Sequence, residues 1–160
     1  MAAQNKETVY VVLHNIRSVH NVGAIFRTAD AAGVSKIFTT GYTPTPLDRF
    51  GRARKDLAKT ALGAEKMVPH EHCEDISDVI AKLRLENVSI ISIEQDEHAL
   101  LYKKVKIKFP CAFIFGNEVS GIQKEILEKS EIILELPMAG KKESLNVAVT
   151  AGIVLFHFLT

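Results

Sequence analysis

The segment Cys111–Phe115 (CAFIF) limits the possible folds of this chain more than any other feature. It follows Pro110 and contains no polar residue, which is typical of a strand that is covered on both faces. Strands of this kind belong to parallel sheets with helices on either side. The segment therefore predicts a buried strand inside an α/β sheet.

The rest of the chain alternates between strand-like and helix-like segments. Apolar residues recur with helical spacing from Val22 to Ala29, with Asn21 as the expected N-cap and Gly33 as the expected end of the helix. Further strands are predicted at residues 8–14, 36–40, 66–68, 88–93 and 132–136, and further helices within 47–62, 76–83, 122–127 and from about 146 onward. This alternation predicts a doubly covered parallel sheet in a single domain over residues 1–160.

Charge is nearly balanced, with 20 Lys and Arg against 19 Asp and Glu. This near-zero net charge excludes a protein that binds nucleic acid through its net charge alone. Any basic surface on this chain must therefore be local. One candidate for such a surface is the set Arg49, Arg52, Arg54 and Lys55. A second is residues 102–108 (YKKVKIK), for which an edge strand protected by lysines is an equally good interpretation.

Cysteine content and hydropathy bear on location. Cys73 and Cys111 are too few for a disulfide framework, so we expect reduced thiols and a cytoplasmic protein. The most apolar stretch, residues 147–159, is too short to cross a bilayer, and we expect it to be a helix buried on most sides. His70, His72 and Cys73 lack a fourth ligand for zinc, so no metal site is predicted.

Three polar segments each follow a predicted strand and precede a predicted helix: residues 14–30, 115–121 and 136–149. In a parallel sheet such loops emerge at the carboxyl edge, where ligands bind. We therefore expect five side chains to converge there: Asn21, Arg27, Glu118, Ser144 and Asn146. A purely structural interpretation is open for each segment, because Ser and Asn commonly cap helices and glycines permit tight turns.

The same three segments resemble the motifs of the SpoU (TrmH-type) branch of the SPOUT RNA methyltransferases. The matching sequences are IRSVHNVGAIFRTAD (16–30), FIFGNEVSGI (113–122) and LPMAGKKESLNVAV (136–149). The resemblance implies an α/β SPOUT fold with a deep trefoil knot in the C-terminal part. It also implies a homodimer that transfers a methyl group from S-adenosylmethionine to a ribose 2′-hydroxyl of tRNA or rRNA. Many relatives carry an additional RNA-binding domain, and we expect none within this chain.

The resemblance also implies roles for individual residues. The five polar side chains named above fall on the positions of the family's catalytic motifs. The methyl donor is expected among Ile93, Gly116, Ile133, Leu136, Met138 and Leu145. A glycine at position 116 would let a ligand approach the main chain closely. Because guanidinium is a poor base, we expect Arg27 to hold a phosphate or stabilise the developing alkoxide.

The remaining polar residues are expected to support Arg27 and the ligand. Asn21 would orient Arg27 or the ribose, and Glu118 would hold Arg27 or backbone N–H groups. Ser144 and Asn146, at a helix start, would order the cofactor pocket or bind a phosphate. Two other functions stay open: an inactive relative that serves as an RNA-binding or assembly factor, and a flavodoxin-like nucleotide-binding domain.

Overall fold

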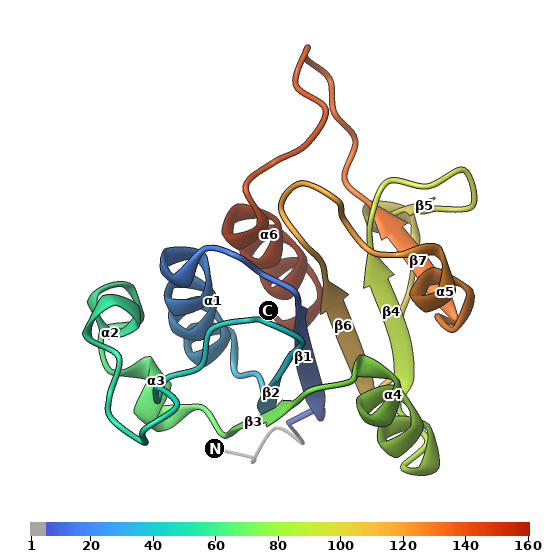
Figure 1. Ribbon diagram of the computed structural model, residues 1–160. Coiled ribbons are helices and arrows are strands. Elements are labelled where there is room, and N and C mark those ends of the chain that lie inside the picture. Colours follow the sequence, from blue (N-terminus) through green and yellow to red (C-terminus); the bar gives the residue numbers. More distant parts are fainter. Residues whose placement is uncertain (1–5) are drawn as a thin grey trace, which may run out of the picture.

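A seven-stranded parallel sheet forms the centre of the computed structural model, which describes residues 6–160 (Figure 1). The strand order is β3-β2-β1-β6-β4-β7-β5. The strands are β1 (Val9–His14), β2 (Lys36–Thr40), β3 (His70–Cys73), β4 (Ser89–Ile93), β5 (Leu100–Leu101), β6 (Cys111–Phe115) and β7 (Ile132–Glu135). The CAFIF segment is the central strand β6, paired with β1 and β4 and buried throughout. The predicted α/β parallel sheet is confirmed.

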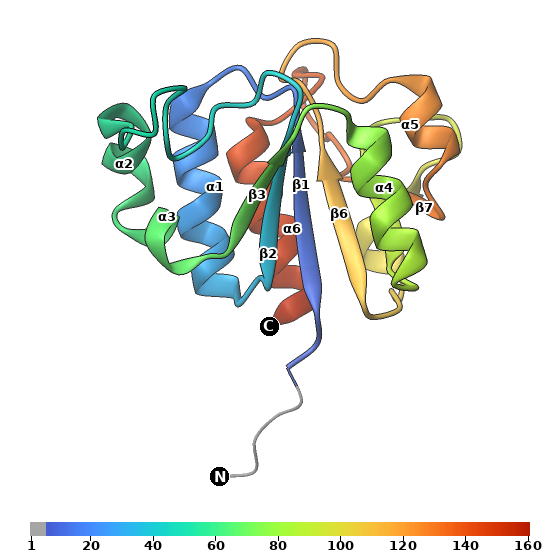
Figure 2. The ribbon, with the colours of Figure 1, turned by 60° about the horizontal axis from the view of Figure 1, so that its bottom comes forward.

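Helices cover both faces of this sheet (Figure 2). One face carries α1 (Val19–Ala32), α2 (Lys55–Ala61), α3 (Ala64–Met67) and α6 (Val147–Leu159), and the other carries α4 (Ile76–Leu85) and α5 (Lys124–Glu128). Two apolar clusters correspond to the two faces: α1 and α6 pack in one, and α4 and α5 in the other. Both faces are therefore stabilised by burial of apolar side chains.

The start of α1 differs from the prediction by one helical turn. Ser18 is the N-cap, and its hydroxyl accepts a hydrogen bond from the Asn21 N–H at 3.2 Å. Asn21 lies within the first turn, so its predicted capping role is wrong and its side chain is free for other contacts. Gly33 ends the helix in the left-handed region at a φ of 81°, as predicted.

The strand predicted at residues 66–68 does not form, and neither does the edge strand that was one of two interpretations of residues 102–108. Residues 66–68 lie at the end of α3, and the neighbouring edge strand is β3. Residues 102–108 contain a 3₁₀ turn (Tyr102–Lys104) after the short edge strand β5. Val105 and Ile107 pack against the cluster beneath α6, so these alternating apolar residues serve the core and not a strand ladder.

The final helix α6 is buried on one side only. Ala151, Val154 and Leu155 are buried, whereas Val149 and Phe156 are 51% and 44% exposed. The expectation of burial on most sides is therefore wrong, because only one face of α6 packs in the cluster formed with α1 and the sheet. The C-terminal knot stays a prediction. Among residues 6–160, no helix is both long enough and apolar enough to cross a membrane.

Candidate active site

Three loops meet where the parallel strands end. They follow β1, β6 and β7, and Figure 1 shows them above the strand tips, with residues 136–146 projecting furthest from the molecule. These are the three polar segments that the sequence analysis placed at one edge. Their convergence follows from the parallel topology, because every strand of the sheet points the same way.

Glu118 joins the loop after β6 to the start of α1. Its carboxylate accepts hydrogen bonds from the N–H of Arg17 (2.9 Å), the N–H of Ser18 (3.1 Å) and Nδ2 of Asn21 (3.3 Å). Burial would raise the pKa of the Glu118 carboxyl, but these hydrogen bonds outweigh it and the pKa lies below the usual value for glutamate. Glu118 was expected to hold either Arg27 or backbone N–H groups. In the structure its carboxylate binds backbone N–H groups and does not bind Arg27.

Asn146 connects the last helix to this network. Its Nδ2 donates to Oδ1 of Asn21 at 3.1 Å, and its Oδ1 accepts from the N–H groups of Ala148 (2.8 Å) and Val149 (3.3 Å). The residue is therefore the N-cap of α6 and also a partner of Asn21. The structural and functional interpretations both apply to the same side chain.

A cavity opens beside this network, between the ends of β4, β6 and β7. Five of the six predicted cofactor residues line it, as do Glu118 and Ser144; the five are Ile93, Gly116, Leu136, Met138 and Leu145. Ile133 does not line it, because its side chain packs with the cluster on the opposite face of the sheet. Residues on one strand alternate between faces, so Ile133 is removed from the set.

Gly116 has a structural reason to be glycine. A Cβ there would lie 2.6 Å from Cγ1 of Ile122 and 2.8 Å from the carbonyl oxygen of Gly121. The loop 116–121 folds back on itself, with a bridge between Asn117 and Gly121. Close approach of the chain to itself therefore requires a glycine here, whatever ligand lies in the cavity.

Comparison with known proteins agrees with this geometry. Residues 8–156 match the profile of the SpoU rRNA Methylase family. The chain belongs to this family. It is 32% identical over 147 residues to the 23S rRNA (guanosine-2′-O-)-methyltransferase RlmB of Ralstonia nicotianae, covering 92% of this chain and 56% of that protein. The tRNA (guanosine(18)-2′-O)-methyltransferase of Escherichia coli is 28% identical, with 98% of this chain and 65% of that protein covered.

Solved structures of SpoU-type proteins have the same fold. An AdoMet-bound rRNA methyltransferase from Sinorhizobium meliloti superposes with a TM-score of 0.85 at 28% identity, covering 95% of this chain and 56% of that chain. The TrmH/SpoU tRNA modifying enzyme of A. aeolicus gives a TM-score of 0.81 at 25% identity, covering 96% and 74%. This chain thus spans little more than half the length of several SpoU relatives that it matches.

Arg27, in the first SpoU motif, lies apart from the other four polar residues. It follows Asn21 by six residues on α1, which is about 9 Å along a helix axis. Its exposed side chain lines a separate groove with Lys59, Leu62 and Phe156. The expected convergence therefore holds for Asn21, Glu118, Ser144 and Asn146, and Arg27 does not lie at the cavity of its own chain.

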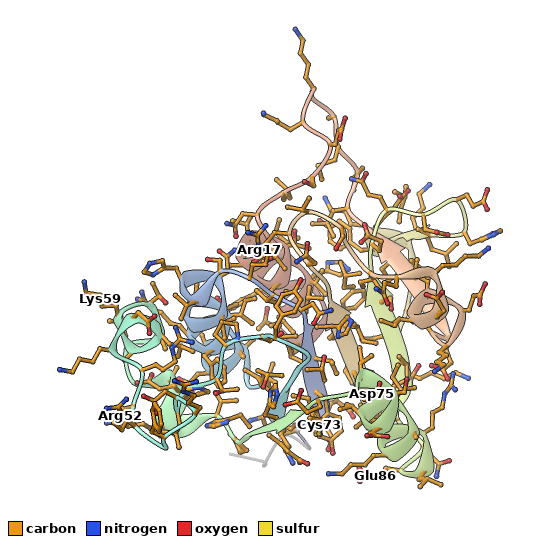
Figure 3. All side chains as sticks on the ribbon, in the orientation of Figure 1. Arg17, Arg52, Lys59, Cys73, Asp75 and Glu86 are labelled. Atoms are coloured by element: carbon orange, nitrogen blue, oxygen red, sulfur yellow. The ribbon has the colours of Figure 1, made fainter. Side chains whose placement is uncertain are left out.

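The basic loop before α2 is partly committed to internal contacts. Arg54 pairs with Asp56 through two hydrogen bonds of 2.7 and 3.1 Å, which raise the pKa of the Arg54 guanidinium and lower that of the Asp56 carboxyl. Arg52 pairs with Asp48 at 3.1 Å. Among residues 6–160, no ion pair involves Arg49 or Lys55. Arg52 lies far from the loops around Arg17 (Figure 3).

Sequence analysis missed Asn117, which is buried at the cavity wall. The signal was its position between Gly116 and Glu118, in a motif already singled out. It also missed three acidic residues that line the cavity: Glu94, Glu135 and Glu143. Glu94 follows β4, Glu135 ends β7 and Glu143 lies in the loop before α6, so they have no common spacing and only the fold brings them together.

No metal site appears in the described part of the chain. His70 and His72 lie on one face of β3 and Cys73 lies on the other, because successive side chains of a strand alternate between its faces. Three neighbouring residues on one strand therefore cannot converge on one ion.

Proposed function

We propose that this chain is an S-adenosylmethionine-dependent RNA 2′-O-methyltransferase acting on tRNA or rRNA. The observation that carries the proposal is the network of Glu118, Asn21 and Asn146 beside a cavity at the carboxyl edge of the sheet. Membership of the SpoU family and the names of its relatives supply the reaction class.

The lining of the cavity fits a sulfonium cofactor. The residues that line it include the acidic Glu94, Glu135 and Glu143 and the apolar Ile93, Leu136 and Leu145. Carboxylates suit the positive charges of the sulfonium and amino groups, while the apolar residues suit the faces of an adenine ring. The cofactor supplies a methyl group already activated by its bond to a positively charged sulfur.

This chain's own residues align the acceptor. The Glu118 carboxylate binds the backbone N–H groups of residues 17 and 18 and Nδ2 of the Asn21 side chain. Nδ2 of Asn146 donates to Oδ1 of the same Asn21 side chain. A rigid frame of this kind holds a ribose hydroxyl in line with the transferred group, which contributes several kcal/mol to catalysis. Arg27 does not lie at the cavity of its own chain, so in this proposal the Arg27 of the second copy in a homodimer stabilises the developing alkoxide or holds the adjoining phosphate.

The homodimer is part of this proposal. Arg27 lines a groove with exposed Leu62 and Phe156, and Val149 is also exposed on α6. A second copy packed on this apolar surface would cover it and bring Arg27 close to an RNA bound by both chains. The set Arg49, Arg52, Arg54 and Lys55 would contact phosphates. Within residues 6–160, Arg49 and Lys55 form no ion pair that such a contact would break. A cytoplasmic location, in keeping with two free thiols, completes it.

Methyl transfer from labelled S-adenosylmethionine to bulk RNA tests the proposal. We expect the labelled methyl group to appear in RNA at one nucleotide, where the adjoining phosphodiester bond becomes resistant to alkaline hydrolysis. In calorimetry, we expect the protein to bind S-adenosylmethionine and to bind neither FMN nor ATP. Cofactor binding without transfer to tRNA or rRNA would favour the inactive relative. Binding of FMN or ATP in place of the cofactor would contradict the family-based assignment.

A further inference from the structure

Tyr42 is an exposed aromatic residue whose position is fixed at both ends. Its side chain is 60% exposed. Its backbone N–H donates to Oδ1 of Asn15 at 3.2 Å, and its hydroxyl accepts a hydrogen bond from Nδ2 of Asn117 at 2.9 Å. A ring held in this way has already lost the freedom that binding a ligand would otherwise remove.

The anchor of the ring is itself part of the cavity wall. Asn117 is buried, and its amide uses every hydrogen-bonding position. Its Nδ2 donates to the Asn15 carbonyl and to Tyr42, and its Oδ1 accepts from the N–H groups of Val119 and Ser120. Asn117 also lines the cavity next to Glu118. Tyr42 is therefore attached directly to the rim of the proposed active site.

The loop that carries Tyr42 is fixed to the sheet as well. The buried hydroxyl of Thr43 accepts from the Ile16 N–H at 3.1 Å and lies 2.8 Å from the carbonyl oxygens of Leu13 and Thr40. These contacts tie the ends of β1 and β2 together. The exposure of Tyr42 is thus a property of a rigid edge, and the ring contributes little to the core.

Chemistry at this edge favours a nucleobase as the occupant. An unpaired base stacks on the face of an aromatic ring, and a nearby cationic side chain binds the phosphate of the same strand. Arg17, labelled in Figure 3, is exposed and follows Ile16, and its backbone N–H donates a hydrogen bond to the Glu118 carboxylate. An unpaired base fits better than a base pair, because the bases of an RNA duplex already stack on one another.

We propose that Tyr42 is the stacking platform for an unpaired base of the RNA at the mouth of the cavity, with Arg17 beside the phosphate. The inference rests on the proposed function and specifies the substrate: the nucleotide presented for methylation lies in a loop or single strand. Tyr42 acts in binding and holds no proton or methyl group in the transfer.

Two substitutions separate stacking from other roles. Tyr42→Phe keeps the ring and removes the hydroxyl, whereas Tyr42→Leu keeps apolar bulk and removes the aromatic face. Base–aromatic stacking typically contributes about 1–3 kcal/mol, so we expect Tyr42→Leu to weaken RNA binding by about tenfold or more. Tyr42→Phe should bind within about threefold of the wild type, and both variants should bind S-adenosylmethionine normally.

A fluorescent base reports the stacking itself. The probe is a short single-stranded RNA that contains 2-aminopurine, and the chain has no Trp to interfere with its emission. We expect quenching on binding to the wild type and to Tyr42→Phe, and much weaker quenching with saturating Tyr42→Leu.

The outcomes distinguish this inference from the proposed function. Equal affinity and equal quenching for the wild type and Tyr42→Leu would overturn the stacking role, even if the wild type methylates RNA. Loss of binding in Tyr42→Phe equal to that in Tyr42→Leu would also overturn it, because the hydroxyl would then be the group that matters. Failure of the wild type to bind S-adenosylmethionine or methylate RNA would instead contradict the proposed function.

Discussion

Glu118 illustrates how neighbouring donors decide the role of a single residue. Glu118 lies in a motif that resembles one of the SpoU family, which suggests a catalytic role, but its oxygens accept hydrogen bonds from the N–H groups of Arg17 and Ser18 and from Nδ2 of Asn21. The Glu118 carboxylate therefore holds in place the residues that directly precede α1. In the proposed reaction, Glu118 would act through the position of Asn21.

Glu118→Gln tests this role through pH. The amide keeps one acceptor and turns an N–H₂ group toward backbone donors, so we expect a loss of about 1–2 kcal/mol of folding free energy at pH 7. Because the folded pKa of Glu118 is lowered, its stabilising effect is complete above the ordinary glutamate pKa of about 4.3. It disappears as the pH falls through the lower folded value.

Denaturant unfolding from pH 7 to acid measures the difference between wild type and Glu118→Gln. We expect the gap to narrow on acidification below about pH 4. A gap independent of pH would show that the ionised carboxylate is not the stabilising form.

Arg27 presents the opposite case, since among residues 6–160 it has no ion pair and lies exposed on α1. Arg27→Ala should change stability by no more than about 0.5 kcal/mol, as expected for a surface site. Its methyl transfer should fall by roughly a hundredfold or more with unchanged cofactor affinity. Arg27→Lys should also be impaired, because lysine lacks the planar fork of donors.

Single-turnover methylation beside a cofactor titration checks this expectation. A variant that methylates at the wild-type rate, or whose only defect is weak cofactor binding, would refute the assignment.

At the scale of elements, the start of α6 serves structure and site together. Asn146 caps the helix through Oδ1 and holds Asn21 through Nδ2, so its two atoms have separate tasks. Asn146→Asp keeps the capping oxygen and removes the donor. Asn146→Ala removes both.

We expect Asn146→Asp to unfold at nearly the wild-type temperature and to lose most methyl transfer, because a carboxylate faces Oδ1 of Asn21. Asn146→Ala should lose the transfer and also about 1 kcal/mol of stability with the cap. Thermal melting with a methylation assay separates the two tasks. If Asn146→Asp keeps full activity, the contact with Asn21 does not serve the reaction.

At the scale of the whole molecule, the surface shared by α1 and α6 carries the proposed dimer. Phe156 is 44% exposed beside Arg27, although it belongs to the most apolar helix of the chain. Phe156→Asp should place a charge in the interface without disturbing the core. We expect the wild type to scatter light as twice the 17.7 kDa chain and the variant as one chain with reduced methylation.

Cofactor binding by the Phe156→Asp variant is the control, since Phe156 does not line the cavity and the α6 residues that do, Val147 and Thr150, lie near the start of that helix. A wild-type protein that is monomeric at micromolar concentration would contradict the dimer. A monomeric variant with full activity would separate the dimer from catalysis.

The sequence by itself determined the α/β class, the central strand β6 and the grouping of three polar loops at one edge. Each depends on local information: an unbroken apolar run, helical spacing, and the rule that parallel strands end on the same side. The family resemblance further indicated five of the residues that line the cavity: Ile93, Gly116, Leu136, Met138 and Leu145. The prediction was wrong for Ile133, because side chains of β7 alternate between the two faces of the sheet and the sequence does not tell which face meets the cavity.

The tertiary structure alone decided which partners these residues bind and which of them are exposed. Sequence spacing does not report that Glu118 binds the N–H groups of residues 17 and 18, or that Asn117 anchors Tyr42 across 75 positions. It also does not report that Arg27 lies away from its own cavity, since the direction of a helical side chain depends on how α1 packs against α2 and α6. Hydrogen bonds and exposure arise from contacts between distant segments, and those contacts exist only once the sheet has assembled.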